Sequence, residues 1–578
     1  MVKQANVPAT MRDGTVLLSD VYRPSQDGSY PVILMRLPYN KTSAQTYVYG
    51  SPSYYASQCY IVVIQDVRGT YASTGEFYPF RHEMTDGYDT VEWAAGLPGS
   101  NGKVGMYGFS YVGATQWLAA TQKPPHLVAI APAMTSADYY DGWAYEGGAF
   151  SLAFNESWPV SDLAPVTATR LGDEALLDTL TNAKAHIQST YNFLPIDRYP
   201  ALAPDRPALA SYFYDWVRHP TDDDYWQQWS IRRRYSDVQV PALNLTGWYD
   251  VFLNGAIENF VRMRKEGGSP TARAGQQLVV RPYIHIPWTR KLGDLDFGPE
   301  ADNRTDAMQI RWFDHWLKGY ANGSEHDPAV RVFVMGANAW RNADDWPIPG
   351  TNFTKYFLHS YGIANSVNGN GALSTVAPQS ELSDHFRYDP ANPAPSRGGH
   401  SCCFADLAPV GPADQADVEK RADVLVYSTL PLEKPVEVTG PISLTLFAST
   451  TAQDTDWTAK LVDVYPDGRV FNLNNGVIRA RFRDSLEHPT LLEKDKIYKY
   501  SIEIWPTSNL FLAGHQIRLE VSSSNYPHYD RNPNTGHDFG KDQELLPADQ
   551  TIYHDEAHPS VLILPLMPVP LPPAQVSK

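Results

Sequence analysis

A serine lies between two glycines in Tyr107-Gly108-Phe109-Ser110-Tyr111-Val112-Gly113. Residues 103–107 before it have the pattern of a strand, and residues 114–120 after it are mostly good helix formers. A strand, a serine and a helix in this order are typical of a nucleophile elbow, a sharp turn that strains the backbone of the serine and leaves room only for small neighbours. The stretch therefore predicts a serine hydrolase in which Ser110 attacks the substrate.

The spacing of the two glycines departs from the commoner pattern. Gly113 stands three positions after Ser110, whereas a G-x-S-x-G elbow has its second glycine two positions after the serine. A short Gly/Ser run is also typical of an ordinary turn. The flanking strand and helix favour the elbow over the turn.

Length and charge limit the classes of function. A chain of 578 residues is long enough for about two to four domains. Its formal net charge of −17 argues against nucleic acid or an anionic membrane as the main partner, because both attract an excess of Lys and Arg. We therefore expect a small-molecule partner, neutral or cationic, and no binding to nucleic acid or to a membrane. The sequence leaves self-association into a homo-oligomer open.

No targeting segment is recognisable. Residues 1–6 lack the apolar stretch of a signal peptide, and no run of about 18 apolar residues occurs. The apolar tail 560–573 is interrupted by prolines. We expect a soluble, cytoplasmic protein.

Cysteines are few. Cys59, Cys402 and Cys403 are an odd number and too sparse for a disulfide framework. Cys402 and Cys403 are adjacent, but neither a Cys-x-x-Cys pair nor other ligand spacing accompanies them. We interpret the pair as small pocket or core residues, because free cysteines are usually buried, and we expect no metal and no cofactor.

Residues from about 14 to 135 alternate short β-branched runs with helix-like segments, which is typical of βαβ units in a mostly parallel sheet. The sheet is expected to resume at residues 241–246 and 277–280. Between these halves, residues 138–235 are Leu-rich and helix-forming, as in 171–187, and carry several tryptophans. We expect a helical insertion that lies over the carboxyl edge of the sheet as a lid, where α/β enzymes bind ligands.

Short alternating strands with Gly, Pro and Asp turns follow residue 350, as at residues 442–446 and 460–464. This pattern predicts a β-sandwich of the jelly-roll type. The predicted fold class is therefore α/β, an α/β-hydrolase core with an inserted helical cap and a C-terminal jelly roll. The predicted domains are the first part of the core at 1–137, the cap at 138–235, the second part of the core at 236–350 and the jelly roll at 351–578.

A serine is a weak nucleophile unless a histidine accepts its proton and a carboxylate orients that histidine. In α/β-hydrolases these residues follow in the order Ser, Asp or Glu, His, just beyond the carboxyl ends of strands. Asp250 directly follows the strand-like residues 243–249, and His285 follows 278–284 in the same way. We predict Ser110, Asp250 and His285 as the catalytic triad and treat the other histidines as bystanders.

The oxyanion that forms during ester cleavage needs hydrogen-bond donors that are already in place. Elbow geometry supplies the backbone N–H of Tyr111, directly after the nucleophile. A second donor is expected from a loop after an early strand, and Tyr39, within Arg36-Leu37-Pro38-Tyr39-Asn40-Lys41, occupies that position with its phenolic hydroxyl. A loop aromatic packed at the surface is the alternative interpretation of Tyr39.

With these residues assembled, the chain resembles the cocaine-esterase-type serine hydrolases, relatives of X-Pro dipeptidyl peptidases and α-amino-acid ester hydrolases. The resemblance spans nearly the whole chain. Beyond the elbow and the Tyr39 loop, the shared motifs are Met11-Arg12-Asp13-Gly14, Gln65-Asp66-Val67-Arg68-Gly69, Gly247-Trp248-Tyr249-Asp250 and Ser522-Ser523-Ser524-Asn525-Tyr526-Pro527. The resemblance implies the same three domains and triad, and it implies Tyr39 and Tyr111 as oxyanion donors.

Two departures bear on the substrate. The usual Gly-Pro-Trp-x-His reads Arg281-Pro282-Tyr283-Ile284-His285, so the surroundings of the base differ. The acidic residues that bind the substrate ammonium group in α-amino-acid ester hydrolases are replaced after Asp250 by Val251-Phe252-Leu253-Asn254. Three side chains instead resemble acyl-pocket positions of cocaine-esterase-type enzymes and favour an apolar or aromatic acyl group: Trp143, Phe252 and Phe404.

The sequence thus predicts a carboxylesterase-type serine hydrolase that acts on a small-molecule ester through an acyl-enzyme. An amide-cleaving acylase or peptidase, or an α-amino-acid ester hydrolase, uses the same triad and stays an alternative. An alternative of another class is a protein that binds carbohydrate through its jelly roll and has an inert hydrolase core.

Overall fold

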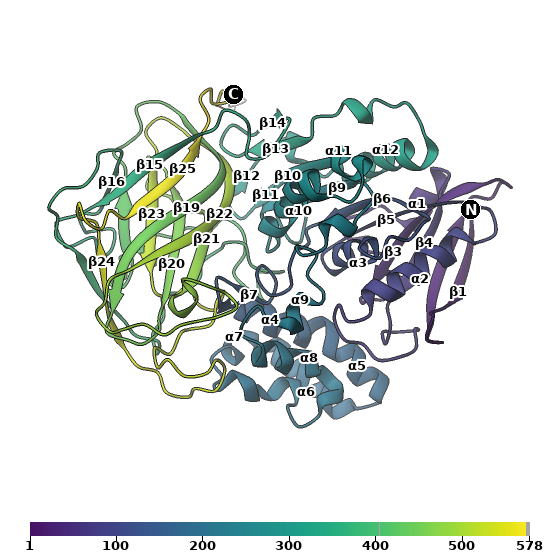
Figure 1. Ribbon diagram of the computed structural model, residues 1–578, viewed down its shortest axis with the longest axis horizontal. Coiled ribbons are helices and arrows are strands. Elements are labelled where there is room, and N and C mark those ends of the chain that lie inside the picture. Colours follow the sequence, from purple (N-terminus) through teal and green to yellow (C-terminus); the bar gives the residue numbers. More distant parts are fainter. Residues whose placement is uncertain (404, 574–578) are drawn as a thin grey trace.

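The computed structural model of the chain describes residues 1–403 and 405–573 (Figure 1). A ten-stranded sheet has the order β1-β2-β4-β3-β5-β6-β9-β10-β13-β14, and the strands from β4 to β13 in this order are parallel. Its strands are β1 (Val2–Thr10), β2 (Val16–Arg23), β3 (Tyr30–Leu37), β4 (Ile61–Asp66), β5 (Ser100–Phe109), β6 (Leu127–Ala133), β9 (Ala242–Tyr249), β10 (Gln276–Ile284), β13 (Val330–Val334) and β14 (Ala339–Ala343).

Helices cover both faces of this sheet, as the continuous apolar strands require. Along β3, Val32 and Leu34 pack in one cluster with α2 and α3, whereas Ile33 and Met35 pack in another with α1 and α12. This alternation follows from the two-residue period of a strand. The helices of this domain are α1 (Pro52–Ser57), α2 (Glu83–Ala95), α3 (Tyr111–Ala120), α10 (Leu253–Glu266), α11 (Pro270–Ala274) and α12 (Thr305–Lys318), and β11 (Lys291–Leu292) pairs with β12 (Leu295–Asp296).

The insertion between β6 and β9 is helical and forms the lower part of the molecule in Figure 1. It begins with the hairpin β7 (Tyr145–Glu146) and β8 (Ala149–Phe150), followed by α4 (Leu152–Trp158), a π-helical turn (Pro159–Leu163), α5 (Ala164–Leu171), α6 (Glu174–Ala185), α7 (Ile187–Thr190), α8 (Pro207–Arg218) and α9 (Asp224–Gln227). The helix expected over 171–187 starts later, because Gly172 ends α5 with a φ of 67° and the Asp173 side chain caps α6.

The C-terminal domain is rich in β-structure. Its eleven strands are β15 (Asn352–His359), β16 (Ala372–Ser374), β17 (Asp384–Tyr388), β18 (Leu425–Ser428), β19 (Val436–Thr450), β20 (Asp456–Val464), β21 (Val470–Arg479), β22 (Tyr498–Phe511), β23 (Gln516–Ser522), β24 (Ala548–Tyr553) and β25 (Val561–Leu566). Buried side chains of this domain, such as Leu461 and Ile504, share one apolar cluster with Trp248 and Phe260 of the hydrolase domain. The two domains therefore pack through a continuous core.

No helix among the described residues is both long and apolar enough to cross a membrane. We propose that the domains have the limits predicted from the sequence, on the basis of the order of helices and strands along the chain. They fall between β6 and the helical insertion, shortly before β9, and between β14 and β15.

Candidate active site

Ser110 lies in the turn between β5 and α3. Its φ of 64° and ψ of −130° are rare for a residue with a side chain. The backbone N–H of Ser110 donates to the carbonyl oxygens of Ala133 (3.0 Å) and Met134 (3.1 Å), which hold the turn against the end of β6. Strained conformations of this kind persist where the surrounding structure imposes them and cluster at functional sites.

The two glycines of the elbow are required for different contacts. A Cβ atom at Gly108 would lie 2.2 Å from Cγ1 of Val112. A Cβ atom at Gly113 would lie 2.7 Å from Cβ of Thr135 and 2.9 Å from the carbonyl oxygen of Ala133, so this glycine lets α3 approach β6. The position that must be small is therefore 113 and not 112, which accounts for the unusual spacing of the motif.

Asp250 and His285 follow β9 and β10, which are parallel neighbours, so both side chains start from the same edge of the sheet. Nδ1 of His285 lies 2.7 Å from Oδ1 of Asp250, and the Thr246 hydroxyl donates to Oδ2 of Asp250 at 2.9 Å. Both residues are almost fully buried. Because a carboxylate only accepts hydrogen bonds, Nδ1 carries the hydrogen, and Nε2 of the neutral ring is left as a base.

The histidine lies beside the elbow. Its ring centroid is 5.3 Å from that of Phe109, the residue directly before Ser110. Ser110, Asp250 and His285 thus come from three strand ends, β5, β9 and β10, of one sheet.

Tyr39 follows β3, and the side chain of Ser110 is one of the groups that act on the pKa of its hydroxyl. The same hydroxyl accepts a hydrogen bond from Nε1 of Trp158 in the helical insertion at 3.1 Å. Burial raises the pKa of Tyr39 well above its usual value near 10, and the carboxylate of Asp162 adds to this effect. The phenol therefore keeps its hydrogen and can donate it.

A buried ion pair shapes the loop that carries Tyr39. Nζ of Lys41 lies 3.0 Å from Oδ2 of Asp66, and the Lys41 backbone N–H donates to Oδ1 of the same carboxylate at 2.6 Å. Asp66 ends β4, the neighbour of β3, so the contact ties the Tyr39 loop to the sheet. This gives two residues of the shared motifs a structural role.

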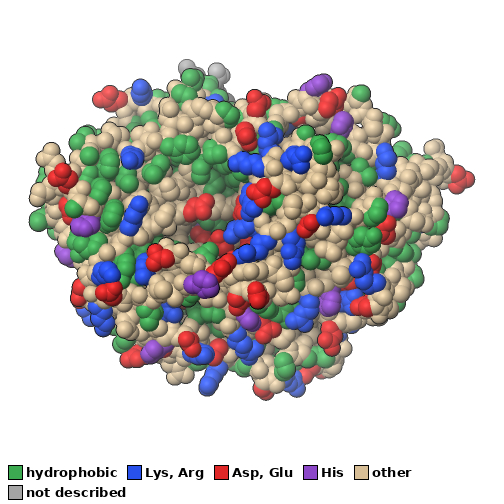
Figure 2. Space-filling model, in the orientation of Figure 1, with side chains coloured by type: hydrophobic (Ala, Val, Ile, Leu, Met, Phe, Trp, Pro, Cys, Tyr) green, Lys and Arg blue, Asp and Glu red, His purple; other side chains and the backbone are tan. Residues whose placement is uncertain are grey.

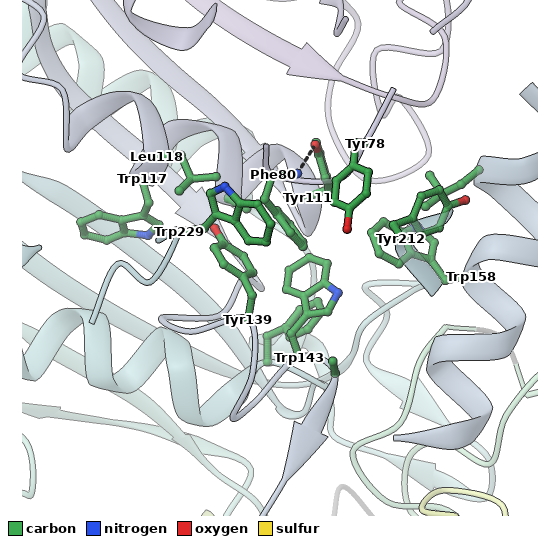
Figure 3. Close-up of a cluster of buried hydrophobic side chains, with 14 of the residues drawn as sticks. Tyr78, Phe80, Tyr111, Trp117, Leu118, Tyr139, Trp143, Trp158, Tyr212 and Trp229 are labelled. Carbon is green, nitrogen blue, oxygen red and sulfur yellow. Dashed lines mark hydrogen bonds between the residues drawn. The ribbon is translucent and has the colours of Figure 1, made fainter. Parts of the chain in front are cut away.

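The Tyr111 side chain points away from the nucleophile into the core. Its hydroxyl donates to Oε1 of Glu83 at 2.8 Å and accepts from the backbone N–H of Phe80 at 3.1 Å, the bond drawn in Figure 3. Arg36 neutralises Glu83 through a contact of 2.6 Å. Only the backbone of Tyr111 is placed to face a substrate, and N–H groups in the first turn of a helix have no partner within the helix.

Aromatic side chains line the histidine on the insertion side. Trp143 stacks on Phe252 with centroids 4.1 Å apart, and Phe252 meets the His285 ring edge to face at 5.4 Å. The ring centroids of Trp158 and Trp143 are 5.5 Å apart, and both side chains are drawn in Figure 3. Trp143 and Phe252 are therefore brought together beside His285, whereas Phe404, the third predicted substrate-binding residue, lies outside the described residues.

The adjacent cysteines also lie next to His285. Ligand atoms of His285, Cys402 and Cys403 are all within 4.8 Å of one another, and a disulfide bond joins Cys402 and Cys403. Cys402 is fully buried, as expected of a pocket or core residue. A disulfide bond between sequence neighbours was not expected. Three cysteines are too few for a network of disulfide bonds, but this count does not exclude a single bond.

Sequence reasoning missed two side chains that touch the site, Trp158 and Thr246. Trp158 contacts Tyr39 across 119 positions of the chain, and no local pattern signals such a contact. The contact of Thr246 could have been predicted, because Thr246 lies four residues before Asp250 on the strand that ends next to this aspartate.

The chain matches two families over most of its length. Residues 13–287 match X-Pro dipeptidyl-peptidase (S15 family), and residues 322–563 match the X-Pro dipeptidyl-peptidase C-terminal non-catalytic domain. The first segment covers the sheet from β2 to β10 with the helical insertion, and the second covers β13, β14 and most of the β-rich domain.

Curated proteins and solved structures that are similar to this chain align with almost its whole length. The chain is similar to a cocaine esterase from Rhodococcus sp. (strain MB1 Bresler), with 40% identity over 97% of the chain and 98% of the relative. It is also similar to the crystal structure of an aminopeptidase from a marine sediment archaeon, Thaumarchaeota archaeon, with 26% identity, a TM-score of 0.82 and coverage of 98% and 96%. An α-amino acid ester hydrolase structure matches with 25% identity and the same TM-score and coverage.

Proposed function

Because the chain belongs to the X-Pro dipeptidyl-peptidase (S15) family and is a serine ester hydrolase, we propose that Ser110, His285 and Asp250 cleave a carboxylic ester through an acyl-enzyme. Oγ of Ser110 attacks the ester carbonyl while Nε2 of His285 accepts the serine proton. The imidazolium then gives this proton to the leaving alkoxide. Water repeats the sequence on the acyl-enzyme and releases the acid.

One contact carries this proposal, the 2.7 Å distance between Nδ1 of His285 and Oδ1 of Asp250 at the strand ends beside the elbow. It leaves Nε2 of a buried imidazole as the base, and it stabilises the imidazolium that forms when the serine loses its proton. The negative charge on the substrate oxygen is stabilised by the backbone N–H of Tyr111 and the hydroxyl of Tyr39, both of which are donors at neutral pH.

The role of Ser110 can be tested with a p-nitrophenyl ester. The Ser110→Ala variant should show neither the burst of p-nitrophenol nor the steady turnover of the unaltered enzyme. Ser57→Ala is the control, because this exposed serine of α1 donates to the carbonyl oxygen of Tyr54 outside the proposed site and its variant should keep the burst. Turnover that persists in Ser110→Ala would exclude Ser110 as the nucleophile.

We propose an apolar or aromatic acyl group for the substrate. The stacked pair of Trp143 and Phe252 beside His285 offers a flat apolar surface next to the base. Val251, Phe252 and Leu253 are buried and apolar, so no carboxylate directly after Asp250 is available to bind an ammonium group. A panel of esters that varies the acyl and alcohol parts independently tests this preference, and equal kcat/KM for acetyl and benzoyl esters would contradict it.

Amide cleavage is the second candidate function, because a solved structure of similar fold is an aminopeptidase. The same triad can cleave amides, so the geometry alone does not separate the two reactions. The ratio of kcat/KM for a matched ester and amide of one acyl group separates them. A ratio in favour of the amide would replace the esterase proposal by an acylase or peptidase.

A carbohydrate-binding protein with an inert core is excluded if Ser110 reacts. A fluorophosphonate labels activated serines covalently, and mass spectrometry of the labelled peptide locates the label. Labelling of the peptide that contains Ser110 is expected, and an unlabelled protein would support the inert core.

A further inference from the structure

Three side chains from distant parts of the chain converge where the helical insertion meets the β-rich domain. Glu146 comes from strand β7, His400 from the segment before β18 and His528 from the segment after β23. Ligand atoms of these three side chains all lie within 4.8 Å of one another. Their exposed fractions are 8%, 1% and 3%, so the cluster is buried. It shares no residue with the proposed active site.

Tight glycine turns place these side chains. Gly147 and Gly148 form the two-residue turn between β7 and β8 with φ values of 51° and 82°, the left-handed pair that such hairpins require. A Cβ atom at Gly147 would lie 2.2 Å from the carbonyl oxygen of Val477, so the hairpin presses directly on β21. A Cβ atom at Gly399 would lie 2.7 Å from Oδ1 of Asn475, also on β21, and His400 follows this glycine.

The surrounding hydrogen bonds fix the tautomer of His400. Nδ2 of Asn474 donates to the carbonyl oxygens of Pro506 (3.0 Å) and Trp248 (3.4 Å), so Oδ1 of this amide faces the histidine. Nδ1 of His400 lies 2.7 Å from that oxygen and must therefore carry a hydrogen. Nε2 lies 3.0 Å from Oε2 of Glu146, so a bound ion would have to replace the hydrogen that these two atoms share. An amide or carboxylate that holds one ring nitrogen while the other faces a ligand is the usual support of a metal-binding histidine.

Two further polar atoms of these side chains are buried. Among the described residues, neither Oε1 of Glu146 nor Nδ1 of His528 has a hydrogen-bond partner. Buried polar atoms are nearly always satisfied by protein, water or an ion. A carboxylate and two imidazoles are a donor set of divalent transition metals.

We propose that Glu146, His400 and His528 bind a divalent transition-metal ion of the Zn²⁺ class, which clamps the helical insertion to the β-rich domain. Trp505 stacks on the His400 ring at 3.8 Å and shields one side of the site. Glu146 and Trp505 also line a cleft of about 670 Å³ that holds Asp141, Glu258 and Glu503.

Of the three proposed ligands, Glu146 lines this cleft, so a cation would reach the site past its carboxylate. Acidic side chains gather in a hollow between the β-rich domain and the rest of the molecule in Figure 2. A lining with more carboxylates than guanidinium groups attracts cations from solution. The ion then completes its coordination shell with water, since the protein supplies three ligands and transition metals of this class take four or more.

Metal uptake tests the proposal. EDTA-treated full-length protein is dialysed against Co²⁺ or Zn²⁺, and the bound metal is counted by plasma mass spectrometry. We expect one ion per chain, visible Co²⁺ absorption of a nitrogen and oxygen site, and a higher unfolding midpoint with metal. Zinc X-ray absorption should show imidazole scattering and no sulfur. Absence of stoichiometric uptake by the unaltered protein would overturn the proposal without any variant.

Variants separate this site from the cysteine pair beside His285. His528→Gln and Glu146→Gln should each lower uptake at least tenfold. The double variant Cys402→Ser, Cys403→Ser and the variant His515→Gln should keep it; His515 is a matched control, because it is buried in the same domain and pairs with Asp463 at 2.7 Å. Uptake that is lost in the cysteine variant, or unchanged in both His528→Gln and Glu146→Gln, would also overturn the proposal. If His528→Gln or Glu146→Gln fails to fold, the zinc X-ray absorption of the unaltered protein decides the question. Sulfur scattering there would overturn the proposal.

Discussion

Nε1 of Trp158 donates a hydrogen bond to the hydroxyl of Tyr39 at 3.1 Å, so a side chain of the helical insertion contacts the proposed oxyanion donor directly. A phenol has one hydrogen to donate and two lone pairs to accept with. Because Trp158 occupies an acceptor position, the hydrogen of Tyr39 is free to point toward Ser110 and a substrate oxygen. The insertion therefore contributes to the orientation of a catalytic group, in addition to covering the sheet.

Tyr39→Phe should lower kcat by about ten- to a thousand-fold, since the loss of one oxyanion donor has cost up to about 2.7 to 4 kcal/mol elsewhere. KM should change little, because the donor acts on the charge that develops in the transition state. Steady-state kinetics on a p-nitrophenyl ester measure both constants. An unchanged kcat would remove Tyr39 from the oxyanion hole.

Trp158→Phe should lower kcat by about two- to ten-fold, because it keeps the aromatic packing and removes one hydrogen bond worth about 0.5 to 1.5 kcal/mol. Trp229→Phe is the control, since Trp229 belongs to the same aromatic cluster (Figure 3) but lies against Tyr78 and Tyr225. This control should leave kcat within a factor of two.

The double variant Tyr39→Phe, Trp158→Phe shows whether Trp158 acts through Tyr39. If it does, the tryptophan change should have almost no further effect on kcat once the hydroxyl is gone. Multiplied effects of the two changes would instead mean that Trp158 contributes independently, for example by packing against the acyl group.

Asp66→Asn should destabilise the fold by about 3 to 5 kcal/mol and lower kcat, because it leaves the buried ammonium of Lys41 unpaired next to the Tyr39 loop. The double variant Lys41→Met, Asp66→Asn should recover part of the lost stability, since it removes both charges. Urea unfolding gives the free energies. As a control, Asp549→Asn breaks an exposed pair with Arg387 and should cost less than about 1 kcal/mol. Equal losses at the two sites would contradict the role of burial.

The order of helices and strands could be predicted from the sequence, because each of them depends on the pattern of apolar residues and glycines within its own segment. The elbow follows from glycines around Ser110, and the positions of Asp250 and His285 follow from the ends of apolar runs. The family match and the fold agree with the predicted α/β-hydrolase core and β-rich C-terminal domain.

Contacts between distant segments could not be read in this way. The bond between Trp158 and Tyr39 depends on how the insertion folds back over the sheet. The cluster of Glu146, His400 and His528 depends on two glycine turns that meet the same strand, β21. Nothing in the spacing of these residues suggests that they meet, and both histidines were treated as bystanders because they fall in the predicted β-sandwich.

Glu156 provides a prediction on pH. This carboxyl group is fully buried in α4, and neither of its oxygens has a hydrogen-bond partner within the described part of the chain. Burial raises its pKa well above its ordinary value of 4.5. The folded protein thus holds the proton more tightly than the unfolded chain. The resulting stabilisation is complete below about pH 4.5 and is lost as the pH rises toward the raised pKa, by about 1.4 kcal/mol per pH unit.

Glu156→Gln removes this dependence, because the amide has no proton to lose in this range. We expect the variant and the unaltered protein to have similar unfolding midpoints near pH 5, and the variant to become the more stable of the two as the pH rises to 8. Thermal unfolding at several pH values measures the difference. Glu174→Gln, an exposed glutamate at the start of α6, is the control and should show no such trend. A constant difference across the pH range would mean that Glu156 is ionised in the folded protein.

Gly113→Ala tests the explanation of the unusual elbow spacing. Alanine is favoured over glycine within a helix by about 1 kcal/mol, so helix propensity alone predicts a more stable protein. The added Cβ atom, however, would lie 2.7 Å from Cβ of Thr135 and 2.9 Å from the Ala133 carbonyl oxygen, the same carbonyl that accepts from the Ser110 N–H. Overpacking of this kind costs about 1 to 3 kcal/mol. We therefore expect a lower unfolding midpoint and a kcat lowered at least tenfold.

Gly96→Ala is the matched control, because Gly96 ends α2 and a Cβ atom there would come no closer than 3.6 Å to any atom. It should change neither stability nor kcat appreciably. Thr135→Ser combined with Gly113→Ala should restore only a small part of both quantities, since it removes the contact with Cγ2 of Thr135 at 2.8 Å but leaves those with Cβ and with the Ala133 carbonyl oxygen. If Gly113→Ala is stabilised and fully active, the contact between α3 and β6 is loose, and the position of the glycine in the motif needs another explanation.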